Sequence, residues 1–317
     1  MRPLVGHTKD VRAVAYCPDG RLVSGGSDRT VRFWDLTTGE TIHKLSAKTP
    51  IYAIAVSPQD GTIAYSGRHP GAESDETPIR TYHLDQHLTG YTFRCPSMTP
   101  PPDAAPYYPN GVPRSLWSLS YSADGQYLAA AGRVMGGGNS PVGGGGHWFR
   151  SDNAAALGPL ATARAFALRF APDGHRLAVT GDGSVEFYAH PMDQAPVISY
   201  PLQSQWAGAV AFVSGTPNAV VGVNSALYFV DAKEKRKPFK VKTGFRAITA
   251  IAPVPNGRAV IVGGRPEGVD VYDSTNGALM TRYDFGLGTV HAVATAPDGL
   301  TFAVAGDDGL ALFDWDL

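Results

Sequence analysis

Cysteine is scarce in this chain: of 317 residues only Cys17 and Cys95 carry a thiol. They are far apart and form no CxxC pair, which excludes a disulfide framework and a cysteine-based metal motif. A reducing compartment, the cytoplasm, is therefore expected. No run of about eighteen apolar residues is present, and the N-terminus has no apolar leader. We therefore predict a soluble, unexported protein that does not bind a membrane.

An excess of charge of one sign is also missing, since the formal net charge is -1. A protein whose main function is to bind nucleic acid or anionic lipid would be more basic, so no nucleic-acid partner is expected. The short basic run Lys233–Lys237 is predicted to be a solvated hairpin. The nine histidines show no metal-ligand spacing such as HExxH, so neither a metal nor a cofactor is predicted.

What the chain does have is a unit repeated about every forty residues, which is typical of stacked or circular arrays of small sheets. Each copy has an apolar strand, a turn, a second strand and a third strand that ends in an aromatic residue. The turns resemble Pro-Asp-Gly and lie at Pro18–Gly20, Gln59–Gly61, Ala123–Gly125, Pro172–Gly174, Pro217–Asn218, Pro255–Gly257 and Pro297–Gly299.

Aligning the first strands on these turns gives columns of uniform size, which alternate between the two sides of a strand. One column is small throughout and reads Ala13, Ala53, Ser118, Ala167, Ala209, Ala250 and Ala292. The next is aliphatic and reads Val14, Ile54, Leu119, Leu168, Val210, Ile251 and Val293. The column after it is small except at Arg169. Small residues suit sheets crowded around an axis, and aliphatic ones suit packing between sheets. We therefore predict an all-β propeller of seven four-stranded blades, a single domain over residues 1–317.

The first copy resembles a WD40 repeat, on the residues Gly6-His7, Ser24-Gly25, Asp28 and Trp34-Asp35. The resemblance extends more weakly over the chain, with Tyr82, Tyr188, Tyr272 and Phe313 at the tryptophan position. It implies that the last blade is closed by a strand from the N-terminus, here around Arg2-Pro3. Proline is tolerated at such an unpaired edge. It also implies a non-catalytic scaffold for protein or peptide partners.

His7, Ser24 and Asp28 have the composition of a hydrolase triad. No Gly-x-Ser-x-Gly elbow surrounds Ser24, however, and the WD40 resemblance implies another role. There, such residues form a buried hydrogen-bonded relay with Trp34 that stabilises one blade. We therefore predict no catalytic residue here. The glycine tracts Gly136–Gly138 and Gly143–Gly146 lack the lysine of a phosphate-binding loop and are expected to be flexible.

Three insertions depart from the minimal repeat, at about residues 68–77, 96–113 and 133–146. All fall in the loop classes that reach one rim of a propeller, and all belong to the second and third blades. The middle insertion is rich in proline and presents Tyr107 and Tyr108. Long loops on a rigid scaffold commonly carry binding sites. An insertion that only packs on itself is the alternative.

One further column, just before the small one, is as varied as its neighbours are uniform. It reads Arg12, Tyr52, Trp117, Phe166, Gly208, Thr249 and His291. The WD40 resemblance implies that these positions surround the mouth of the central channel. We predict a partner-binding face of Arg12, Tyr52, Trp117, Phe166 and His291 together with Tyr107 and Tyr108. Aromatic residues that merely plug the channel are the alternative.

Two other functions stay open. An enzyme or a small-ligand or metal-binding propeller, similar to lactonases or quinone-dependent dehydrogenases, would need acidic or histidine ligands at the channel mouth. The aligned column offers only Arg12 and His291 as ionisable groups there. The chain could also be the docking end of a longer polypeptide or complex.

Overall fold

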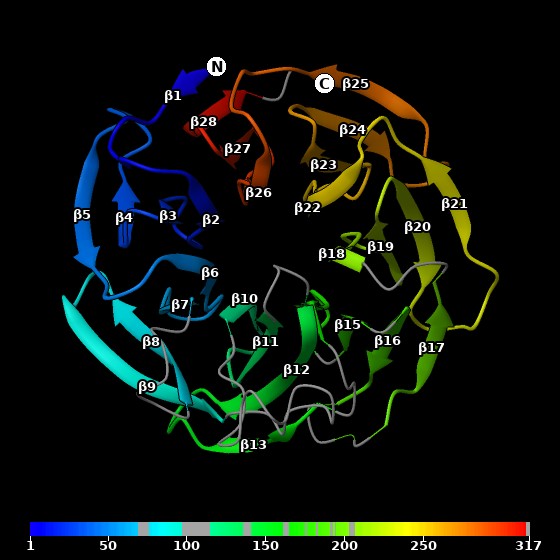
Figure 1. Ribbon diagram of the computed structural model, residues 1–317, viewed down its shortest axis with the longest axis horizontal. Helices are drawn as coiled ribbons and strands as arrows, with labels where there is room; N and C mark the ends of the chain where they lie inside the picture. The colour runs from blue at the N-terminus through cyan, green and yellow to red at the C-terminus, as the bar shows by residue number, and fades with distance from the viewer. Residues whose placement is uncertain are drawn as a thin grey trace.

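The computed structural model describes residues 1–68, 76–96, 115–135, 141–160, 165–174, 176–181, 183–190, 193, 195–202 and 207–314. These residues form 28 strands in seven four-stranded sheets. In Figure 1 the sheets stand as blades around a common centre, with one short strand of each blade at the hub and one at the perimeter. Every pairing is antiparallel, and the described residues contain no helix, so the predicted seven-bladed propeller is confirmed. The described part of the chain accordingly lacks any helix that could cross a membrane.

The blades follow one another along the chain, and each runs from the hub outward. Blade one has β2 (Val11–Tyr16), β3 (Leu22–Gly26), β4 (Thr30–Trp34) and β5 (Thr41–Ser46). Blade two has β6 (Ile51–Val56), β7 (Ile63–Gly67), β8 (Glu76–His83) and β9 (Leu88–Pro96). Blade three has β10 (Ser115–Tyr121), β11 (Tyr127–Met135), β12 (Pro141–Arg150) and β13 (Ala156–Pro159). Blade four has β14 (Ala167–Phe170), β15 (Leu177–Gly181), β16 (Ser184–Tyr188) and β17 (Ile198–Pro201).

The remaining three blades repeat this order. Blade five has β18 (Ala207–Phe212), β19 (Asn218–Val223), β20 (Ala226–Asp231) and β21 (Phe239–Lys242). Blade six has β22 (Ala247–Pro253), β23 (Ala259–Arg265), β24 (Val269–Asp273) and β25 (Leu279–Tyr283). Blade seven has β26 (Val290–Thr295), β27 (Thr301–Gly306), β28 (Gly309–Asp314) and, from the other end of the chain, β1 (Arg2–Pro3).

The ring is closed by β1, which supplies the outermost strand of blade seven as predicted. Arg2 pairs with Leu312 and Pro3 with Ala311. The Leu4 amide donates to the Leu310 carbonyl oxygen at 2.9 Å, and the Leu4 side chain is 4% exposed. The strand itself has only two residues, and the buried Leu4 side chain adds apolar packing with Leu310 and Leu312 of β28.

The core of the protein lies between the blades. Ala13 of the small column packs in a cluster with Ile51 and Ile54 of blade two. Val14 of the aliphatic column packs on the other side with Ala303 and Leu310 of blade seven. The alternation along one hub strand therefore fills two different interfaces, which is why both columns are uniform around the ring.

Residue sizes are matched across these interfaces. A Cβ atom on Gly25 would lie 2.5 Å from Cγ2 of Ile51 in the next blade, so only glycine leaves room for the isoleucine. The same relation pairs Gly222 with Ile248 and Gly263 with Val290. Where the second strand carries Thr180 instead, the next blade has Ala207, and the threonine hydroxyl donates to the Ala207 carbonyl oxygen at 2.9 Å. Small and large residues thus alternate between partners to keep the packing dense.

Two predictions about local structure are wrong. Gly143–Gly146 is not a loop but part of β12, paired with β11 from Gly143 opposite Val134 to Gly146 opposite Ala131. A Cβ atom on Gly146 would lie 2.2 Å from the Leu160 side chain, so close packing requires glycine there. In blade five, Asn218 begins β19, and the turn lies earlier, around Gly215 with its φ of 72°.

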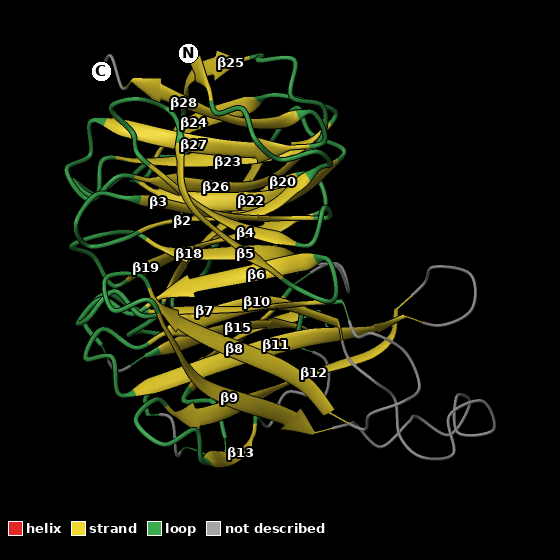
Figure 2. Ribbon diagram, turned by 90° about the vertical axis from the view of Figure 1, so that its left-hand side faces the viewer, coloured by secondary structure: helices red, strands yellow, loops and turns green. Residues whose placement is uncertain are grey.

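The described ends of all three insertions lie on the rim where the hub strands β6 and β10 begin. Ile51 is opposite Gly67, and Ser115 is opposite Arg133, so β7 ends and β11 continues toward that rim. The extended hairpin of β11 and β12 reaches Met135 opposite Pro141. Figure 2 shows these strands projecting past the neighbouring blades on one side.

Candidate binding site at the mouth of the central channel

The variable column of the hub strands lies at a β-bulge. In six blades the strand register slips by one residue at this position, leaving Arg12, Tyr52, Trp117, Gly208, Thr249 or His291 as the extra residue. A bulge re-aims the side chain of the extra residue away from the regular alternation. The bulges therefore direct one variable side chain per blade to the channel mouth and leave the packing columns undisturbed.

In four blades a glycine on the second strand leaves room for the backbone beside the bulge, whereas blade five has Val223 at this position. Gly67 lies opposite the residue before the bulge, and a Cβ atom there would be 2.0 Å from the Pro50 carbonyl oxygen. Gly264 and Gly306 face backbone carbonyl oxygens at 2.4 Å in the same way, and Gly26 faces one at 3.0 Å. A side chain at these positions would push the bulged backbone away, so the glycines maintain the geometry of the mouth.

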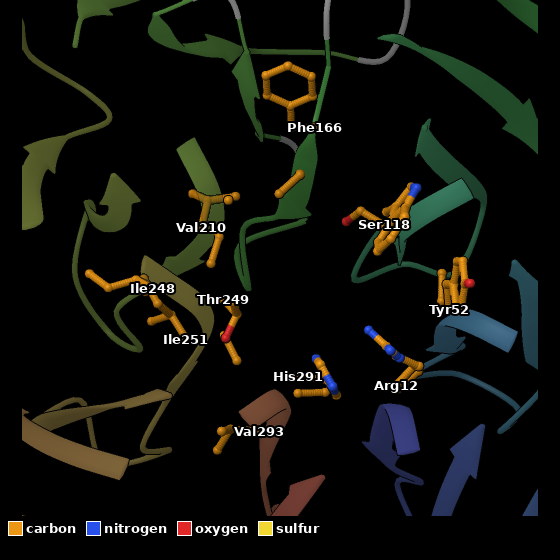
Figure 3. Close-up of a pocket in the computed structure, with 18 of the residues that line it drawn as sticks. Arg12, Tyr52, Ser118, Phe166, Val210, Ile248, Thr249, Ile251, His291 and Val293 are labelled. Carbon is orange, nitrogen blue, oxygen red and sulfur yellow. The ribbon is translucent and has the colours of Figure 1, made fainter. Parts of the chain in front are cut away.

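The mouth opens into a cavity of about 420 Å³. It is lined by the bulge residues, by the two packing columns and by Arg169, Asn224 and Arg265. Figure 3 shows Arg12, Tyr52, Thr249 and His291 arranged around the open centre. A concave site of this size, with apolar walls and few polar groups, can take a side chain or short segment of a partner.

Three bulge side chains form a continuous stack over blades one to three. The ring centroids of Tyr52 and Trp117 are 4.6 Å apart with an interplanar angle of 33°. The Arg12 guanidinium carbon lies 5.8 Å from the Tyr52 ring centroid. Such a flat, partly exposed surface favours burial of apolar groups and cation–π contact.

Phe166 contributes less to this surface than the sequence predicted. Its side chain belongs to the cavity lining but is only 5% exposed. In Figure 3 the ring points away from the centre of the cavity. Phe166 therefore supports the wall from behind, and the accessible aromatic surface of the predicted face is that of Tyr52 and Trp117. Tyr107 and Tyr108 lie outside the described residues.

The opposite part of the mouth is polar. His291 Nε2 lies 2.7 Å from Asp307 Oδ1, and Arg12 Nε is ion-paired with Asp10. Burial lowers the pKa of His291, although its hydrogen bond to Asp307 acts in the opposite direction. The imidazole is therefore neutral near pH 7 and is held in one orientation by the carboxylate. Figure 3 shows Arg12 and His291 side by side.

Asp10 and Asp307 are site residues that sequence reasoning missed. Asp307 lies in the turn between β27 and β28. The oxygens of both aspartates and a His291 nitrogen lie within 4.8 Å of one another, close enough to share a metal ion. The Arg12 guanidinium already neutralises Asp10, so a metal would have to displace it.

The four residues of the predicted relay are joined by hydrogen bonds in blade one, away from the channel mouth. His7 contacts Asp28 Oδ2 through Nδ1 at 2.9 Å and Ser24 Oγ through Nε2 at 2.8 Å. Trp34 Nε1 donates to the same serine oxygen at 2.8 Å, and both Ser24 and Trp34 are fully buried. All four polar groups thus have partners, with no open space beside Ser24 for a substrate.

Other blades replace the relay with shorter networks. In blade six the buried Asp270 accepts two hydrogen bonds from Arg282, each 2.7 Å long, and one from the Tyr272 hydroxyl at 3.0 Å. In blade four the Tyr188 hydroxyl donates to Glu186 at 2.8 Å. The tyrosine hydroxyls bond within their own strands, β24 and β16, and in blade six the Arg282 contact joins β24 to β25.

Comparison with known proteins supports the resemblance to the WD40 family. Residues 1–35 match the family described as "WD domain, G-beta repeat". Similar proteins include small ribosomal subunit protein RACK1y of Oryza sativa subsp. japonica, 33% identical over 40% of this chain and 33% of that protein. MST50-interacting protein 11 of Pyricularia oryzae is 40% identical over 17% of each chain. The tRNA (guanine-N(7)-)-methyltransferase non-catalytic subunit wuho of Anopheles gambiae is 44% identical over 14% of this chain and 12% of that protein.

The matched regions thus span a third or less of these relatives. Together with the seven blades, the match over residues 1–35 confirms the WD40 resemblance.

Proposed function

We propose that this WD40-type propeller is a non-catalytic scaffold that binds a protein or peptide at the mouth of its central channel. The observation that carries the proposal is the set of bulges, which bring variable side chains from different blades to one cavity. Packing alone does not require this, because the two columns beside each bulge already fill the blade interfaces. Tyr52 and Trp117 are the central contacts, with Arg12 and His291 at the polar side.

The relatives favour the same role. One is named as a ribosomal subunit protein, another as a non-catalytic subunit and a third as an interacting protein. All three printed names describe proteins that act within assemblies. We carry over to this chain only that general role, with a protein partner, while the proposed cytoplasmic location rests on the scarcity of cysteine. Absence of a nucleic-acid partner stays a prediction from the charge balance.

The direct test is quantitative affinity capture from cell lysate with mass spectrometry. We expect the double variant Tyr52→Ala/Trp117→Ala to lose specific partners that the wild-type chain captures. Tyr91→Ala is the matched control, because Tyr91 is 53% exposed on the outer strand β9 and lies away from the hub. Full capture by the double variant, with an unchanged unfolding temperature, would rule out this face.

A metal-binding propeller is the second candidate, favoured by the Asp10, His291 and Asp307 cluster. Elemental analysis of the purified chain separates the two functions. Stoichiometric metal that is lost in an Asp307→Asn variant would support the second candidate, and metal-free protein that still captures partners would support the first.

A further inference from the structure

Arg169 is the exception in an otherwise small column of the hub strands. The equivalent residues are Ala15, Ala55, Ser120, Ala211, Ala252 and Ala294. The Arg169 side chain is exposed and lines the channel cavity instead of filling a blade interface. Its Nη1 atom donates to the Leu119 carbonyl oxygen of the preceding blade at 3.3 Å. Since the other blades pack without this contact, the ring itself does not require an arginine here.

The charges that line the cavity are all of one sign. Arg12, Arg169 and Arg265 line it beside the neutral His291, and no aspartate or glutamate is among the described lining residues. Arg12 and His291 have carboxylate partners just outside the lining, Asp10 and Asp307.

Arg169 and Arg265 differ from these two residues. Within the part of the chain that the structure describes, neither is ion-paired, and the only hydrogen bond of the Arg169 side chain is the long one to Leu119. Among the described residues, the cavity therefore has two guanidinium groups that no carboxylate of the lining balances.

The surroundings of Arg169 make this imbalance costly. The side chain has surface exposed to the channel, yet burial among the blades lowers the pKa of its guanidinium. An arginine nonetheless stays charged in a protein. A cation that is partly stripped of water and lacks an acidic partner gains most from an anion that supplies paired, charge-assisted hydrogen bonds. Low-dielectric walls around one sign of charge also concentrate the field on such an anion.

We propose that Arg169, with Arg265 nearer the surface, forms an anion site that takes the carboxylate or phosphate group of an acidic side chain on the partner. Tyr52 and Trp117 flank the entering segment, and Arg169 anchors its charge. This inference rests on the proposed function, because it assigns the chemistry of the partner that occupies the same mouth.

Fluorescence anisotropy with the full chain tests the site in about 0.1 M salt, where charges more than about 10 Å apart are largely screened. The probes are a labelled peptide of alternating glycine and glutamate, its glutamine counterpart and its phosphoserine counterpart. We expect the wild-type chain to bind the acidic probes and not the glutamine probe. Tighter binding of the phosphoserine or of the glutamate peptide identifies which anion the site prefers.

The variants separate this site from general charge attraction. Arg169→Ala places the residue of five other blades in the column, so the fold should tolerate it, and it should weaken binding of the preferred acidic probe by at least about tenfold. Arg169→Lys should be intermediate, because lysine keeps the charge but not the paired donors. Arg258→Ala is the control: it removes the same charge from an exposed turn between β22 and β23 and should change binding by less than about twofold.

Three outcomes would overturn the anion site: no binding of either acidic probe by the wild-type chain, equal binding by Arg169→Ala, or an equal loss in Arg258→Ala. Partner capture distinguishes this failure from failure of the proposed function. If Tyr52→Ala/Trp117→Ala abolishes capture while Arg169→Ala leaves both capture and probe binding unchanged, the binding face stands and only the anion site is wrong.

Discussion

At the scale of single residues, the relay in blade one shows why a polar group in a propeller is buried only with partners. His7 and Asp28 have side chains that are 2% and 4% exposed, and each is held by several hydrogen bonds. Ser24 accepts from Trp34 and contacts His7, so the loss of His7 removes one hydrogen-bond partner from Ser24 and one from Asp28. A buried group that loses its partner destabilises the fold by its full desolvation cost.

Replacing His7 by alanine should therefore lower the free energy of unfolding by about 1–3 kcal/mol. Urea denaturation followed by fluorescence measures this change. His190→Ala is the control, because His190 is exposed and its loss should change stability by less than about 0.5 kcal/mol. Equal stability of His7→Ala and wild type would show that the relay does not stabilise the blade.

The relay should also make stability depend on pH. Burial lowers the pKa of His7 from 6.5. Burial acts to raise the pKa of Asp28, but hydrogen bonds from Thr30 and the nearby His7 outweigh it and lower this pKa from 3.8. Both shifts mean that the unfolded chain binds protons more readily than the folded one. The free energy of unfolding should therefore fall as pH falls below 6.5, and fall further near and below 3.8.

Denaturation at about pH 7 and about pH 5 isolates the histidine contribution. The pKa values of His43 and His291 are lowered as well, so these two residues should also make the wild-type chain lose stability over this interval. His7→Ala should lose less stability over the interval than His190→Ala does. An identical pH dependence of the two variants would contradict a neutral, buried His7.

At the scale of strands, the bulge links packing to binding. The variable column could be recognised from the sequence because its neighbours are uniform, and its place at the channel mouth followed from the family resemblance. The bulge itself was not predicted, because it is a property of the register between two strands. The signal was present in the glycines at the ends of the second strands, Gly26, Gly67, Gly264 and Gly306. The close approach of a backbone carbonyl oxygen explains these glycines.

The glycine-rich composition of one segment led to a wrong prediction of flexibility. Gly143–Gly146 is a paired strand, and Gly146 is required by contact with Leu160 and the Ala130 backbone. Phe166 belongs to the variable column but is buried. Its burial depends on residues from other parts of the chain, so the local sequence pattern did not predict it. Local pattern thus predicted which position varies and not how much of each side chain is exposed.

Two glycine substitutions test the role of the bulge against that of blade packing. Gly67→Ala places a methyl group against the Pro50 carbonyl oxygen, and Gly25→Ala places one against the Ile51 side chain. Each should cost about 1–3 kcal/mol. A double-mutant cycle with Ile51→Ala should show a favourable coupling energy for Gly25→Ala, because the smaller partner relieves the clash, and little for Gly67→Ala. Equal coupling in the two cycles would contradict this assignment of the contacts.

At the scale of the whole molecule, the sevenfold ring and its closure were predictable because they repeat a simple pattern of strand lengths and residue sizes. The contacts between charged and polar side chains at the channel mouth were not predictable in this way. His291 meets Asp307 across a strand pair, and Arg169 is placed in the channel by the ring as a whole. Both depend on how the blades are arranged, and the cavity is one site only because seven blades share an axis.

Hydrogen exchange of the chain, free and bound to a partner purified through the wild-type capture, tests the central claim most directly. A partner at the channel mouth should slow exchange in the peptides that contain Tyr52, Trp117 and His291. The turns on the other rim, such as those at Asp19 and Asp298, should exchange as in the free protein. Protection confined to those turns or to the outermost strands β5, β9 and β21 would contradict binding at the mouth.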